Sequence, residues 1–73
     1  MFSGDTVDLL KKISESHLEM TTNFLNASLD GLNKSNPNMF KSEMVDDLKS
    51  KISASTAVNQ DNIDLFIGQV FWV

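Results

Sequence analysis

The chain has 73 residues, no cysteine, one histidine, and a net charge of −4 from six lysines and ten carboxylates. This composition excludes disulfides, thiolate metal sites and multi-histidine metal cages, and an acidic chain without arginine argues against binding to DNA or RNA. A polypeptide this short forms one domain at most and usually needs a partner or very good packing to be stable.

The first predicted element is a helix over about residues 5–33. Asp5 or Thr6 can cap its start, and Gly31 and Asn33 are suited to ending it. Its apolar residues recur at the spacing of a one-sided helix. They fall on one broad stripe: Val7, Leu10, Ile13, Leu18, Phe24, Leu25, Leu29 and Leu32.

A cluster of helix-breaking residues over 34–38 predicts a turn. Asparagine is a good N-cap and proline is favoured at the first helical position, so Asn36 and Pro37 are expected to start a second helix. A short connection makes the two helices antiparallel neighbours. With the fold point near Asn36, Phe24 would lie level with Leu48.

The second helix is predicted over about residues 38–72. Its weak point is "SASTAVNQDN", residues 53–62, because these side chains compete for backbone hydrogen bonds. The helix could therefore break near residues 57–62 and leave a third, short helix from about residue 61. The apolar positions before and after the weak segment keep the same helical phase, which favours one long helix.

The predicted fold is thus all-α: an antiparallel helical hairpin in a single domain, residues 1–73. An edge strand in "LFIGQVFWV" is the alternative for the C-terminal segment, but no second strand is available to pair with it. Two helices alone leave more apolar surface than monomers usually expose. We therefore expect oligomerisation to complete the fold, as a four-helix dimer or a larger helical assembly.

The C-terminal segment "FIGQVFWV" is the candidate interface. Aromatic residues are typical interface anchors because each removes a large apolar area from water. Packing of the segment back onto the first helix is the alternative. The predicted interface residues are Phe66, Val70, Phe71 and Trp72, with Phe24 and Leu25 of the first helix.

Polar residues of the two stripes are expected to meet near the middle of the hairpin. His17 would lie level with Ser55, with Thr21 and Asn59 close by. Such a polar layer can fix helix alignment and oligomeric state at some cost in stability. The alternative is a loose middle with no specific role.

No catalytic pattern stands out, and we expect neither an enzyme nor a metal or cofactor site. The glycines are scattered, so there is no phosphate-binding loop. The lone His17 on a helix stripe is more typical of a packed core residue than of a catalytic base. Asp46 and Asp47 diverge by about 100° on a helix, which makes them a poor acid–base pair.

The ends of the chain give the expected location. The start has no basic leader followed by an apolar run, and the apolar C-terminal stretch of eleven residues is too short to span a bilayer. We expect a cytoplasmic protein without a membrane span. A substrate of a dedicated export machine that needs no signal peptide would have the same features.

Residues 29–53 resemble the needle subunits of bacterial type III secretion systems. The likeness rests on "LDGLNKSNPN" followed by "DDLKSKIS". It implies a small, cysteine-free helical hairpin with an Asn-Pro turn that polymerises into a filament. The chain departs from that family where such subunits make polymer contacts, because it is shorter beyond "SKIS" and lacks a polar, basic tail.

Three functional hypotheses follow. The first is a non-enzymatic interaction protein that self-associates through its apolar stripe and C-terminal aromatic segment. The second is a subunit of a structural or secreted filament. The third is a small regulator or adaptor, of the kind that phage and plasmids encode, whose apolar face is covered by one larger protein.

Overall fold

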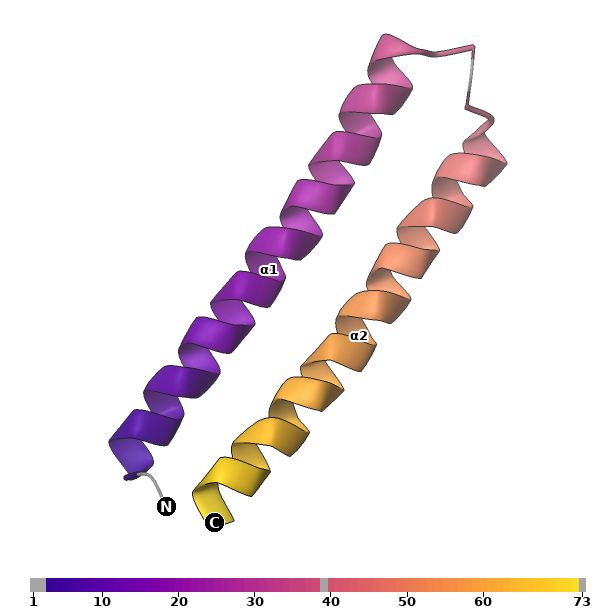
Figure 1. Ribbon diagram of the computed structural model, residues 1–73. Helices are drawn as coiled ribbons and strands as arrows, with labels where there is room; N and C mark the ends of the chain where they lie inside the picture. The colour runs from indigo at the N-terminus through magenta and orange to yellow at the C-terminus, as the bar shows by residue number, and fades with distance from the viewer. Residues whose placement is uncertain (1–2, 39, 73) are drawn as a thin grey trace.

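The computed structural model describes residues 3–38 and 40–72, apart from the side chains of Phe71 and Trp72. Two helices account for nearly all of this: α1, Gly4–Ser35, and α2, Ser42–Trp72. They lie side by side and antiparallel, so that the first turn of α1 and the last turn of α2 are at the same end (Figure 1). The predicted all-α helical hairpin is confirmed, and residues 3–38 and 40–72 contain no strand.

The start of α1 is capped by Ser3. Its backbone is extended, its hydroxyl accepts a hydrogen bond from the Thr6 N–H at 3.3 Å, and its carbonyl accepts one from the Val7 N–H at 3.0 Å. Serine is a strong N-cap for this reason. Asp5, an expected cap, instead lies in the first turn, where the helix dipole favours a negative charge.

Asn36 ends α1 and does not start α2, so the predicted cap was wrong. Its backbone N–H and its side-chain Nδ2 both donate to the Leu32 carbonyl, at 3.0 and 3.2 Å. Pro37 disfavours helical geometry at the residue before it, and Asn36 accordingly has φ −132° and ψ 63°. The chain needs several more residues to turn, and α2 begins only at Ser42.

The later turn shifts the register between the helices. Thr22 contacts Thr56 and Glu15 contacts Gln60. The sequence predicts that Phe24 lies level with Leu48. The observed pairs are displaced from that register by roughly one to two helical turns. The cause is the start of α2 at Ser42, because the expected start at residue 38 would have placed every later residue one turn further along.

Helix α2 is continuous through the weak segment, as the phase of its apolar residues favours. Thr56 donates its hydroxyl to the Ile52 carbonyl one turn back at 3.0 Å. Gln60 uses its side-chain amide on Glu15 and Asp64. A helix tolerates a threonine bond to the carbonyl one turn back, and Gln60 bonds to side chains only, so both side chains are satisfied within a continuous helix.

The hairpin is a single layer of helices with a minimal core. The buried apolar side chains are Val7, Leu29 and Val45, with 5%, 7% and 7% of their surface exposed. The radius of gyration is 16.6 Å, against about 11 Å for a compact domain of this length. A second layer is what normally encloses a hydrophobic core.

Gly31→Ala should raise the free energy of unfolding by about 0.5–1 kcal/mol, because alanine favours a helix interior more than glycine does. Gly31 lies inside α1 without a positive φ, and an added Cβ would meet nothing within 4 Å. Urea denaturation followed by circular dichroism measures the change. Gly4→Ala, at the first helical residue, is the control and should change stability less; a destabilised Gly31→Ala would contradict the prediction.

Candidate functional site

One face of the hairpin carries hydrogen bonds that cross between the helices. Gln60 Nε2 donates to Glu15 Oε2 at 2.9 Å and to Asp64 Oδ1 at 3.2 Å. The hydroxyls of Thr22 and Thr56 lie 2.7 Å apart. Because Thr56 donates its proton to the Ile52 carbonyl, Thr22 is the donor between the two threonines. The middle of the helix contact is therefore joined by polar side chains.

A salt bridge joins the helices nearer the turn. Lys49 Nζ lies 2.9 Å from Asp30 Oδ1, with 45% and 60% of these side chains exposed. A second pair, Lys51 with Asp47, lies within α2 at the same distance and is also exposed. Exposed pairs contribute little to stability because water and salt screen them.

The carboxylates lie toward one side and the back of the hairpin. At about 100° per residue, they occupy a sector of roughly 100° on each helix, and on α2 this sector reaches the side away from α1, where Asp47 pairs with Lys51. The crossing bonds of Glu15 and Asp30 identify that side. We call it the carboxylate face; it carries Asp5, Asp8, Glu15, Glu19, Asp30, Glu43, Asp46, Asp47, Asp61 and Asp64.

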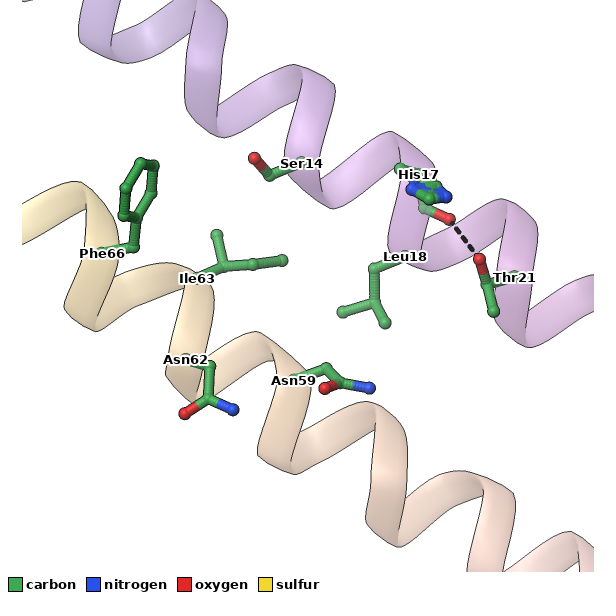
Figure 2. Close-up of a pocket in the computed structure, with 8 residues that line it drawn as sticks. All are labelled: Ser14, His17, Leu18, Thr21, Asn59, Asn62, Ile63 and Phe66. Carbon is green, nitrogen blue, oxygen red and sulfur yellow. Dashed lines mark hydrogen bonds between the residues drawn. The ribbon is translucent and has the colours of Figure 1, made fainter.

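The opposite side, which we call the open face, has two open grooves between the helices. The groove nearer the open end of the hairpin has a volume of about 460 Å³ (Figure 2). Leu18 of α1 and Ile63 of α2 point toward the space between the helices there. Its lining is Ser14, His17, Leu18, Thr21, Asn59, Asn62, Ile63 and Phe66.

The second groove of the open face lies nearer the turn and has a volume of about 380 Å³. Its lining is mostly aliphatic, with Lys51 as its charged residue: Leu25, Ser28, Leu29, Leu32, Leu48, Lys51, Ile52 and Ser55. The open face is thus apolar toward the turn, polar around His17 and Asn59, and apolar again at Ile63 and Phe66.

The predicted interface residues are placed differently from one another. Phe66 and Leu25 line the two grooves of the open face and are 49% and 43% exposed. Phe24 is 69% exposed on the flank of α1 next to that face, and Val70 is half-buried. The side chains of Phe71 and Trp72 lie outside the described residues, so the role of the aromatic tail stays a prediction.

The predicted polar-layer residues all lie on the open face. His17, Thr21 and Asn59 line its first groove, and Ser55 lines the second. All of them are exposed. Thr21 donates its hydroxyl to the His17 carbonyl at 3.0 Å, a bond within α1 (Figure 2). None of the hydrogen bonds found between the helices involves these residues, and their role in alignment or oligomeric state stays a prediction.

Thr22, Glu15 and Gln60, which bond across the contact, are not among the residues predicted from the sequence. A signal for Thr22 was present: Leu18, Thr22, Leu25 and Leu29 follow one another at intervals of four, three and four. That interval is typical of residues that face a neighbouring helix. The apolar stripe is broad, and the contact with α2 runs along one edge of it and not along its centre.

Chemical sites of other kinds are not found in the described part of the chain. No cluster of three or more histidine, cysteine or acidic residues could hold a metal ion there. Within the same residues, neither helix combines the length and hydropathy needed to cross a bilayer. The surface that remains to be explained is the open face.

No family model, curated protein or solved structure matches this chain. The likeness to needle subunits therefore remains a resemblance between short segments and assigns no family. The functional conclusion depends on the geometry of the hairpin.

Thr22→Val should lower the free energy of unfolding by about 0.5–1.5 kcal/mol, because it removes the hydroxyl that donates to Thr56. Thr22→Val with Thr56→Val should cost less than the sum of the single changes, with a coupling of about 0.5–1 kcal/mol. Denaturant unfolding of the four proteins measures this cycle.

Thr21→Val is the matched control, since Thr21 is the neighbouring threonine and its hydroxyl bonds only within α1. Its effect should add to that of Thr56→Val, because the hydroxyl next to Thr56 is that of Thr22. Strictly additive effects of the Thr22 and Thr56 changes would show that the 2.7 Å contact contributes nothing.

Proposed function

We propose that this chain is a non-enzymatic protein–protein interaction module that self-associates. The observation that carries the proposal is the amount of apolar side chain left exposed. The exposed large apolar residues outnumber the buried ones: Leu9, Ile13, Met20, Phe24, Leu25, Leu32, Met44, Val58, Leu65 and Phe66. A surface of this kind is typical of a chain whose core is completed by association.

The total surface supports the same conclusion. The hairpin exposes 5681 Å². A compact monomer of its mass, 8.1 kDa, exposes about 4,500 Å². The excess of about 1,200 Å² is somewhat more than the ~800 Å² that each partner contributes to a standard interface. Burial in one interface of ordinary size would remove about two-thirds of that excess.

Self-association is favoured over binding a foreign protein because a second copy supplies the missing layer without any further component. Two hairpins give the four helices of a bundle, a common solution for helices with one apolar side. Homo-oligomers with two-fold symmetry are also the most frequent assemblies of proteins.

Size-exclusion chromatography with light scattering should give a discrete small oligomer, with a mass of two or a few chains, that dissociates on dilution. Circular dichroism of the same samples should show helicity that falls as the assembly dissociates, because association supplies much of the core. A monomer with undiminished helicity at every concentration would contradict self-association.

The same measurement separates the other functions expected from the sequence. Growth into long assemblies would favour a structural or secreted filament subunit, in keeping with the resemblance to needle proteins. A monomer with weak side-chain packing would favour a regulator or adaptor that is completed by a larger protein.

A further inference from the structure

We propose that the open face is the surface on which two copies meet, while the carboxylate face stays in water, so that the assembly is a four-helix dimer. This inference rests on the proposed function and adds the surface and the partner. The partner is a second copy of the chain. Three features of the hairpin support it: the direction of the apolar stripes, the distribution of charge and the polar middle of the open face.

The apolar stripe of each helix does not point at the other helix. Laid out at about 100° per residue, the middle of each stripe lies roughly 50–80° from the line of contact, toward the open face on both helices. On α1 the contact line runs through Thr22 and Leu29, and Ile13 and Phe24 point away from it.

The direction of the stripes indicates what covers them. An isolated helix pair would have its stripes on the line of contact. In a square bundle of four helices each stripe points between two neighbours, about 45° from either one. Here the stripes lie at least that far from the line of contact. They therefore fit a second layer of two helices better than a single foreign helix set between α1 and α2.

The distribution of charge is compatible with a second copy of the chain as the partner. Each chain carries −4, so two copies repel one another wherever their carboxylates come close. No carboxylate lines either groove of the open face, and Lys51 lines the groove nearer the turn. Contact through the open face leaves the carboxylates of both copies pointing outward.

The polar middle of the open face is suited to meeting itself. His17 and Asn59 each have both a hydrogen-bond donor and an acceptor, so each can pair with its counterpart in another copy, and Thr21, whose proton goes to the His17 carbonyl, can still accept a hydrogen bond. They lie near the middle of α1 and α2, with an apolar groove toward the turn and Ile63 and Phe66 toward the open end. A two-fold related copy therefore places polar residues on polar residues.

Two matched pairs of charge substitutions test the face. Thr21→Glu and Asn59→Glu add a carboxylate to the open face; Asn23→Glu and Ala57→Glu add the same charge two residues away, toward the carboxylate face. All four positions are exposed in the hairpin. Because an introduced charge would face its own copy across the interface, Thr21→Glu and Asn59→Glu should raise the dimer dissociation constant at least about 100-fold. The two controls should change it by less than about tenfold.

Sedimentation equilibrium gives the dissociation constants. A monomeric wild-type chain would overturn the proposed self-association itself. A wild-type dimer that Thr21→Glu and Asn59→Glu weaken no more than their controls would overturn the open face alone. An oligomer larger than a dimer would overturn the four-helix arrangement.

A second measurement does not depend on weakening the dimer. The chain has no cysteine, so Thr21→Cys and Asn23→Cys each provide a single site for a spin label. Both residues lie at nearly the same level of α1 and differ mainly in the face to which they point. Labels at Thr21→Cys should be closer to one another across the dimer than labels at Asn23→Cys, and equal or reversed distances would overturn the proposal.

Discussion

Two helices that lie side by side share one line of contact, and this limits what the chain can bury. Each helix presents its neighbour with little more than one row of side chains, so only Val7, Leu29 and Val45 are buried among the described residues. The structure is long and one helix thick, with extents of 54 × 16 × 9 Å. A second layer is needed for a core of ordinary size, and residues 3–38 and 40–72 form a single layer.

Asn36 and Pro37 fix which residues share that line. The proline prevents α1 from continuing, and the asparagine closes its last turn on the Leu32 carbonyl. Helix α2 then begins far enough along that Thr56 meets Thr22. The chemistry of the turn thus places polar side chains, and not the centres of the apolar stripes, at the middle of the contact.

The two long helices and the continuity of α2 could be predicted from the sequence because periodicity and phase are properties of a single helix. The register could not, since it depends on whether Asn36 caps the helix before it or the one after it, and both roles are open to asparagine. The apolar pattern also could not show whether Thr21 or Thr22 contacts α2. These neighbours differ by about 100° around α1, and the apolar stripe is broad enough to include either one.

The polar contact has a consequence for folding. The hydrogen bonds that Thr22 donates and Glu15 accepts replace bonds to water, so their net contribution is small and the hairpin gains little stability from the contact between its own helices. The larger apolar area, including Phe24 and Phe66, lies where only another molecule can cover it. If a second copy covers it, folding and association become one equilibrium, and the stability of the hairpin depends on its concentration. This division of polar and apolar residues is the physical basis of the proposed self-association.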